Sequence, residues 1–156
     1  MPSREIRRIS EDSFRLDLHP QVRQLLLDLK EMTLSHVEDN SPVARRIFPV
    51  AYQNSPEMEM DFQQLTREPL TNHHRHNLTI FERTLSRSEL NQLEALAWMS
   101  ALNDMRLILG TALDLSEDEV TPAEDDPNYE GYVVYNLLTY LQGVLIEEVQ
   151  SDASDR

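Results

Sequence analysis

Apolar residues recur with a helical period after Pro20. They keep a period of three and four positions, at Val22, Leu25, Leu26, Leu29, Thr33 and Val37. This spacing forms one stripe along a helix, which is the pattern of a helix that buries a single face. The pattern predicts an amphipathic helix from Pro20 to about Val37.

Prolines mark the starts of further helices. Four of them follow a residue that can cap a helix, in Ser41-Pro42, Ser55-Pro56, Thr121-Pro122 and Asp126-Pro127. A proline is tolerated in a first helical turn because its missing N–H would have no partner there. We predict a short helix or turn over 43–52 and a helix over 56–67. Pro69 then either kinks that helix or starts a new one that runs to about Leu85.

Two long helices are predicted in the second half of the chain. One begins at the cap Ser88 and keeps its apolar period until Gly110, which we expect to end it in a left-handed conformation. The other runs from about Asn128 to Val149, and its apolar residues cover more than one face. Such a helix is expected to be central to the core or to a dimer contact. Gly143 within it would let another helix approach closely.

The first eighteen residues differ from the rest. Residues 14–18 alternate strictly between apolar and polar, and residues 10–13 favour a turn, so 5–9 and 14–18 predict a short β-hairpin. A lone hairpin is marginal in water and must pack on helices. The expected fold class is therefore mainly α. We predict one helical domain over 1–150, a bundle of five or six helices with a hairpin at 5–18, an acidic loop at 114–127 and a disordered tail at 151–156.

Composition narrows the chemistry that the chain can perform. Its 156 residues include three glycines and no cysteine. Disulfides, thiolate metal sites, iron–sulfur clusters and catalytic thiols are therefore excluded. Neither a glycine-rich phosphate loop nor a Gly-x-Ser-x-Gly motif is present. We expect a protein that is not an enzyme and that uses no cofactor.

The net charge of −14 is concentrated in the second half of the chain. Residues 1–78 hold 10 basic and 12 acidic side chains, whereas residues 79–156 hold 4 and 16. This excess disfavours broad contact with DNA or anionic lipid, so we expect direct DNA binding to be weak or absent. The chain shows no secretory signal and no apolar run of about 20 residues that would span a membrane. A cytoplasmic location without membrane association is expected.

A polar cluster is predicted in the helix that follows Ser88. Its members are Trp98, Asn103, Asp104 and Arg106. Asn103 and Arg106 are three positions apart and share a helix face, which Asp104 does not share with Arg106. Because the neighbouring apolar residues are expected to be buried, at least one of these polar groups needs a partner on another element. We favour a structural clamp between helices over a ligand or partner site.

A basic patch is predicted on the hairpin, and its residues are Arg4, Arg7, Arg8 and Arg15. Without aromatic stacking residues or a recognition helix, the indication of nucleic-acid binding is weak. Contact with an acidic protein surface, including the acidic half of a second copy, is an equal alternative.

His73, His74 and His76 suggest a metal site, because His73 and His76 are three positions apart on a helix. A metal site needs three or four ligands, so a solvated helix face is the preferred interpretation. Asp114, Ser116 and Asp118 resemble the start of a calcium loop. The later positions of that loop require a glycine and a glutamate that the chain lacks, and a solvated acidic loop is favoured.

Three separated blocks resemble the signature stretches of one protein family. They are FQQLTREPL at 62–70, WMSALNDMRLILGT at 98–111 and YNLLTYLQGVL at 135–145. Over about residues 6–149 the chain is similar to an actinobacterial family of small helical proteins, which includes the oxidative-stress transcriptional regulator AosR. The resemblance implies a regulator that acts by protein–protein contact with a sigma factor and RNA polymerase. The redox sensing of that family depends on paired cysteines, so it does not extend to this chain.

Two alternatives to a regulator remain open. The first is a small-ligand or metal-binding domain that uses His73, His76 and the residues from Asn103 to Arg106. The second is a structural homodimer formed through the apolar face of residues 132–149.

Overall fold

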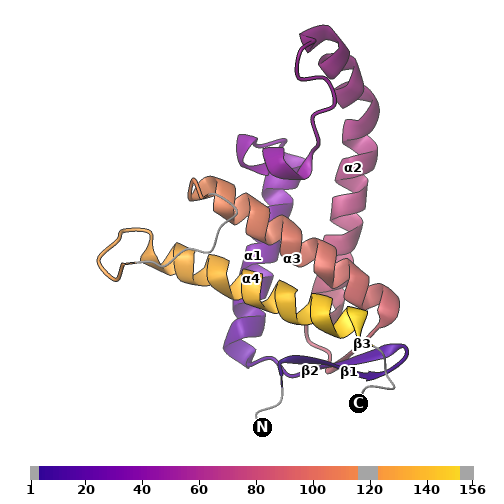
Figure 1. Cartoon of the computed structure of the whole chain (residues 1–156), viewed down its shortest axis with the longest axis vertical. Coiled ribbons are helices and arrows are strands. Elements are labelled where there is room, and N and C mark those ends of the chain that lie inside the picture. Colours follow the sequence, from indigo (N-terminus) through magenta and orange to yellow (C-terminus); the bar gives the residue numbers. More distant parts are fainter. Residues whose placement is uncertain (1–3, 116–122, 152–156) are drawn as a thin grey trace.

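The computed structural model describes residues 4–115 and 123–151 (Figure 1). Its helices are α1 (Pro20–Glu38), the 3-10 helix η1 (Pro42–Ile47), α2 (Pro56–Thr84), α3 (Gln92–Ala112) and α4 (Tyr129–Gln150). The strands β1 (Ile6–Ser10), β2 (Ser13–Leu16) and β3 (Glu89–Asn91) form one antiparallel sheet in that order. The predicted mainly α fold with an N-terminal hairpin is confirmed. Residues 116–122 of the predicted acidic loop and 152–156 of the predicted tail lie outside the described residues.

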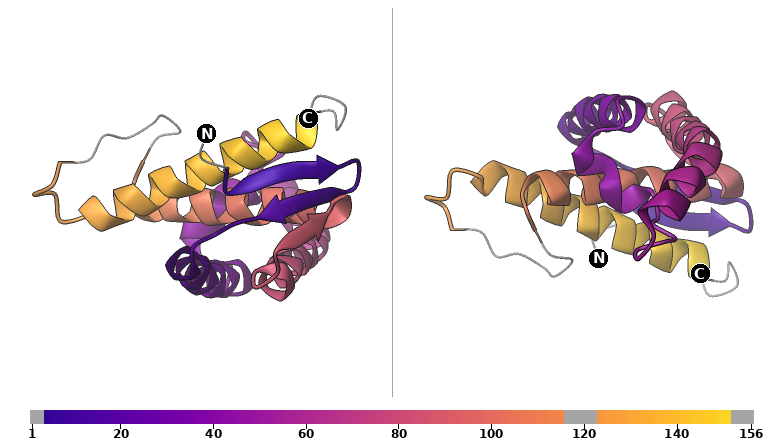
Figure 2. Two further views of the ribbon diagram at one scale, coloured as in Figure 1. Left: turned by 90° about the horizontal axis from the view of Figure 1, so that it is seen from below. Right: turned by 90° about the horizontal axis from the view of Figure 1, so that it is seen from above.

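The central helix of the fold is α3. The antiparallel helices α1 and α2 lie side by side on one side of α3, and α4 runs antiparallel to α3 on the other side (Figure 2). The sheet lies where α1 begins and where α2 and α4 end (Figure 1). The prediction gave α4 a place in the core or in a dimer contact, and its Leu138, Leu141 and Leu145 do lie in the core. The dimer contact stays a prediction. That helix packs on α3 and β1, and its Val133 and Tyr140 are exposed.

Most helices start where capping residues and prolines predict. Ser41 and Ser55 each accept a backbone N–H in the first turn of η1 and α2. Pro69 starts no new helix, because α2 continues through it. Both Pro69 and Leu65 are exposed. The Leu65 carbonyl, which loses its helical donor at the proline, can therefore be hydrated instead.

The segment after Ser88 is a strand, whereas the sequence predicted a helix start there. β3 pairs with β2, and Leu90 lies opposite Phe14 in the buried face of the sheet. The cap of α3 is Asn91, whose side chain accepts the N–H of Glu94 at 2.8 Å. The Glu94 carboxylate accepts the N–H of Asn91 in return, at 2.9 Å. This capping box satisfies two N–H groups at once and so stabilises the later start.

Gly110 lies inside α3, where the prediction placed the end of the helix. The helix continues to Ala112, and Asp114, with φ of 57°, takes the left-handed conformation. A Cβ atom on Gly110 would lie 2.9 Å from Cε2 of Tyr135, so the glycine lets the α4 ring approach α3. Among the described residues, the close approach predicted at Gly143 is wrong, because no other element comes within 4 Å of the position that a Cβ would take there.

The two faces of the sheet have different chemistry. Ile6 lies opposite Leu16, and Arg8 lies opposite Phe14, on the face that packs on the helices. Arg7 and Arg15 are opposite each other on the exposed face. The inner face joins a core that includes Leu26, Leu78, Phe81, Trp98, Leu102, Leu138 and Leu141.

Arg8 connects strand β1 to the last turn of α4. Its buried guanidinium lies 4.5 Å from the centre of the Phe14 ring. Nε donates to the Glu148 carbonyl at 3.0 Å, and Nη2 donates to the Val149 carbonyl at 2.9 Å. The backbone N–H of Arg8 also donates to the Glu148 carboxylate at 2.8 Å. The guanidinium adds charged donors to carbonyls in the last turn of α4, and its positive charge opposes the negative end of the helix dipole.

We expect Arg8→Ala to lower the free energy of unfolding by about 3 kcal/mol, because the last turn of α4 loses charged donors to its buried carbonyls. Arg7→Ala removes the same side chain from the exposed face and should cost less than about 0.5 kcal/mol. Urea denaturation, followed by the emission of the single tryptophan, measures both. Equal stability of the two variants would contradict this role for Arg8.

Candidate functional site

The predicted polar cluster on α3 separates into contacts with two helices. Asn103 and Arg106 contact α4, whereas Trp98 and Asp104 contact α2. The prediction that Asp104 does not share the face of Arg106 is confirmed. These four side chains therefore form separate interhelical contacts and do not surround one site.

The contacts with α4 are polar. Gln142 Nε2 donates to Asn103 Oδ1 at 3.2 Å, and Arg106 Nη1 donates to the Tyr135 hydroxyl at 3.2 Å. The Arg106 guanidinium carbon lies 5.8 Å from the centre of the Tyr135 ring. These bonds hold α4 against the central helix, beside the point where Gly110 admits the Tyr135 ring.

Trp98 belongs to the core. Its indole Nε1 donates to Thr84 Oγ1 at 2.6 Å, and its ring packs on Phe81 with the ring centres 4.4 Å apart. The side chain is fully buried. Trp98 therefore joins α3 to the end of α2 and offers no surface to a partner.

Asp104 and His74 form a buried polar pair. Asp104 is 2% exposed, and its Oδ2 lies 2.7 Å from Nδ1 of His74 on α2. The other ring nitrogen, Nε2, lies 3.1 Å from the Ile47 carbonyl oxygen in η1. One imidazole thus connects α2, α3 and η1. A solvated position for His74 was a wrong prediction, although His73 and His76 are exposed.

The pair holds a proton more tightly in the folded protein. Burial lowers the pKa of His74, but the hydrogen bond and charge of Asp104 outweigh it and raise that pKa above 6.5. Burial also raises the pKa of the Asp104 carboxyl above 3.8, although His74 opposes this change. With a proton between Nδ1 and Oδ2, Nε2–H can donate to the Ile47 carbonyl, so both ring nitrogens of His74 are bonded.

The position of His74 is that of a structural residue that connects three helices. A catalytic histidine has one nitrogen oriented by a carboxylate and the other directed at a nucleophile or substrate. Here Nε2 is directed at the backbone carbonyl of Ile47. In this arrangement both ring nitrogens of His74 contact groups of the fold.

The predicted basic patch is also divided. Arg8 is buried, and Arg4 Nη1 lies 2.7 Å from the Glu147 carboxylate. Arg7 and Arg15 remain exposed on the outer face of the sheet. The four arginines therefore do not present one basic surface.

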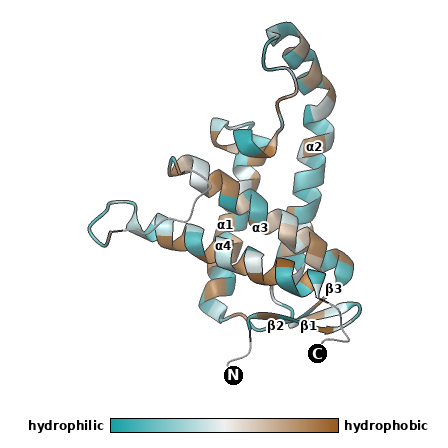
Figure 3. Ribbon diagram, viewed as in Figure 1, coloured by the Kyte–Doolittle hydropathy of each residue, from teal (hydrophilic) through white to brown (hydrophobic). Residues whose placement is uncertain are grey.

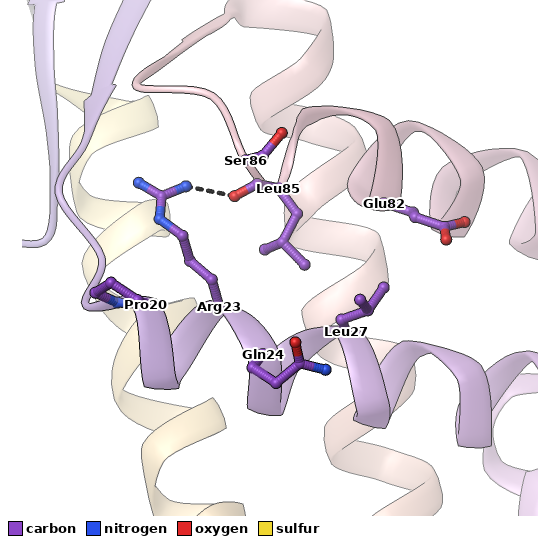
Figure 4. Close-up of a pocket in the computed structure, with 7 residues that line it drawn as sticks. All are labelled: Pro20, Arg23, Gln24, Leu27, Glu82, Leu85 and Ser86. Carbon is purple, nitrogen blue, oxygen red and sulfur yellow. Dashed lines mark hydrogen bonds between the residues drawn. The ribbon is translucent and has the colours of Figure 1, made fainter.

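A groove of about 300 Å³ lies between the start of α1 and the end of α2 (Figure 4). It is lined by Pro20, Arg23, Gln24, Leu27, Glu82, Leu85 and Ser86. The Arg23 guanidinium donates to the Leu85 and Arg87 carbonyls after the end of α2. The Glu82 carboxylate pairs with Lys30 Nζ at 2.7 Å. Arg23 and Glu82, the two charged residues that line the groove, thus both bind groups of this chain.

The first half of α2 projects beyond the body of the molecule (Figure 1). The buried residues of α2 begin at Asn77, whereas apolar and polar positions alternate along the projecting turns (Figure 3). Tyr52, Met58, Phe62 and Leu65, here called the α2 tip surface, line a shallow groove of about 190 Å³ together with Asp61. Leu65 is 78% exposed. The sequence pattern of Met58, Phe62 and Leu65 predicts this helix, but not that its apolar stripe stays uncovered.

The segment before α2 is fastened to the first turns of the helix. The Glu59 carboxylate accepts the N–H groups of Ala51 at 2.9 Å and Tyr52 at 2.8 Å. A hydrogen bond from Gln63, together with these N–H donors, lowers the pKa of Glu59. The same bonds place the Tyr52 ring edge-on to Phe62, with the ring centres 6.1 Å apart. The chain's own hydrogen bonds therefore hold the two aromatic rings of the α2 tip surface in contact without a partner.

Two other properties bear on the hypotheses from the sequence. Across 4–115 and 123–151, no group of three or more histidine, aspartate or glutamate side chains is arranged to hold a metal ion. Part of the calcium-like segment that begins at Asp114 lies outside these residues. None of the described helices is long and apolar enough to cross a membrane.

The fold and its contacts define a class of small helical protein. A central helix is joined to its neighbours by buried polar pairs, and one helix carries an uncovered apolar surface. The family model described as a domain of unknown function, DUF2017, matches residues 3–149. The chain therefore belongs to the DUF2017 family. No curated protein and no solved structure matches it.

We expect the free energy of unfolding to fall as the pH rises above 6.5. Because the folded pKa of His74 is raised above 6.5, its stabilising contribution is fully present below that pH and is lost as the pH rises through the folded value. His74→Gln should flatten this dependence, whereas His73→Gln, at an exposed neighbour, should retain it. Urea denaturation at several pH values measures the slope. The same slope in both variants would show that His74 is not the responsible group.

Proposed function

We propose that this protein is a non-enzymatic regulator that acts on transcription in the cytoplasm by binding a sigma factor or an RNA polymerase subunit. The α2 tip surface is the observation that carries the proposal. Membership of the DUF2017 family is compatible with it. The resemblance of three sequence blocks to the family of the oxidative-stress regulator AosR supplies the transcriptional role.

The energetics of the α2 tip surface favour a protein partner. Burying apolar surface contributes about 25 cal/mol for each Å² removed from water. The projecting half of α2 gains little of this from its own chain, because its buried residues begin at Asn77. Aromatic residues, methionine and leucine grouped on an exposed helix are typical of protein interaction sites. A partner would cover side chains that the fold leaves in water.

The buried polar pairs support binding over catalysis. His74, Asp104 and Arg8 contact groups within the fold, and their donors and acceptors are directed at other helices or at backbone carbonyls. The proposed regulator also has no cysteine. Any response to oxidative stress would therefore come through its partner or through another group, and not through a disulfide.

Affinity-tagged protein should retrieve a sigma factor or a polymerase subunit from cells that express it, as identified by mass spectrometry. Leu65→Asp places a charge on the α2 tip surface and should abolish the recovery. Leu93→Asp is the matched control, because Leu93 is 77% exposed on α3, outside this surface. Repeated clean purifications of the unsubstituted protein that contain neither partner would refute the proposed function.

A further inference from the structure

We infer that the α2 tip surface binds an amphipathic helix whose apolar stripe is flanked by arginine or lysine. This inference rests on the proposed function, since it names the kind of segment that the partner would present.

The apolar part of the surface has the form of a helix-binding groove. Met58, Phe62 and Leu65 follow one another at i, i+4 and i+7 and so lie along one face of α2. Tyr52 forms one wall of the same groove and is held against Phe62 through the Glu59 bonds. A partner helix can insert its own i, i+3, i+4 and i+7 side chains along such a line. The surface belongs to a helix and presents no strand edge, so an added β-strand has no backbone partners there.

The rim of this groove is acidic. Residues 49–66 contain Glu57, Glu59 and Asp61 and no lysine or arginine. Asp61 lines the groove itself, and Glu57 and Asp61 together line the neighbouring hollow. The next basic residue, Arg67, has its guanidinium carbon 3.4 Å from the centre of the Phe48 ring, so its charge is directed toward the body. Charge complementarity therefore requires basic residues beside the apolar stripe of the partner.

A second copy of this chain is a poor match for the groove, which requires an apolar stripe flanked by basic residues. Two copies would bring together molecules that each carry a net charge of −14. The exposed arginines of the sheet, Arg7 and Arg15, have no apolar stripe between them. The exposed apolar residues of α4, Val133 and Tyr140, lie on a helix that also exposes Glu147. The exposed arginines of the sheet and the exposed apolar residues of α4 thus lie on separate elements, and neither supplies an apolar stripe flanked by basic residues.

Binding of two labelled helical peptides to the full-length protein tests the inference. The first peptide carries leucine in one stripe and arginine elsewhere, and the second carries glutamate in place of arginine. Fluorescence anisotropy should show binding of the arginine peptide and at least about tenfold weaker binding of the glutamate peptide. Leu65→Ser should weaken binding of the arginine peptide by about tenfold, whereas Leu93→Ser should change it less than about twofold.

A second pair of variants separates local charge from the overall acidity. Asp61→Asn should weaken binding of the arginine peptide by about threefold, whereas Glu124→Gln, the same charge change at an exposed distant site, should not. Equal effects within either pair of variants would overturn the inference, and so would no binding of the arginine peptide. Self-association that Leu65→Ser abolishes and Leu93→Ser retains, measured by light scattering, would assign the groove to a second copy and also overturn it. The circular dichroism of each variant should be unchanged, since the substituted side chains are exposed.

The two proposals can fail separately. Recovery of a sigma factor or polymerase subunit that Leu65→Asp does not affect would leave the proposed function standing and remove this site. Site-specific binding of the arginine peptide, with no transcription protein recovered, would retain the helix-binding groove and remove the proposed function.

Discussion

The bond between Asp104 and His74 determines how α2 lies on the rest of the molecule. A buried carboxylate that loses its partner costs about 3–5 kcal/mol, so α2 must pass α3 at the position that keeps the two side chains together. The same imidazole holds η1 through the Ile47 carbonyl. The contact lies about two-thirds of the way along a 29-residue helix. The turns after it reach the core, and the first turns extend beyond the body, which leaves the α2 tip surface exposed.

Arginines bind the ends of two helices to distant parts of the chain. Arg8 binds the last carbonyls of α4, and Arg23 binds carbonyls just after α2. A guanidinium has several donors in one plane and can serve carbonyls of different residues at once, which a lysine does less well. Of the four arginines in the predicted basic patch, only Arg8 is buried and used to close the fold, whereas Arg7 and Arg15 stay exposed. On α2, Met58 and Leu65 are exposed and line one groove.

The local elements were largely predictable from the sequence, whereas their partners were not. Pro20 and Ser55-Pro56 mark helix starts because caps and prolines act within one turn. Asn91 displaced Ser88 as a cap because Leu90 pairs with a strand far away in the chain, and a local pattern does not contain that contact. Likewise, His74 resembled its exposed neighbours until the fold placed Asp104, 30 positions away, beside it. The stripe of Met58, Phe62 and Leu65 indicates a helix. Whether the fold covers that stripe depends on how far α2 extends before its first buried residue, Asn77.

Amide hydrogen exchange of the full-length protein tests most directly whether the first half of α2 is an uncovered binding surface. The account predicts faster exchange in residues 58–66 than in residues 78–84 of the free protein, because only the later turns are buried. Addition of the leucine–arginine helical peptide should then slow exchange in residues 50–66 and leave α4 and the sheet unchanged. Equal protection of both halves of α2 in the free protein, or peptide-induced protection located on α4 or the sheet, would contradict the account.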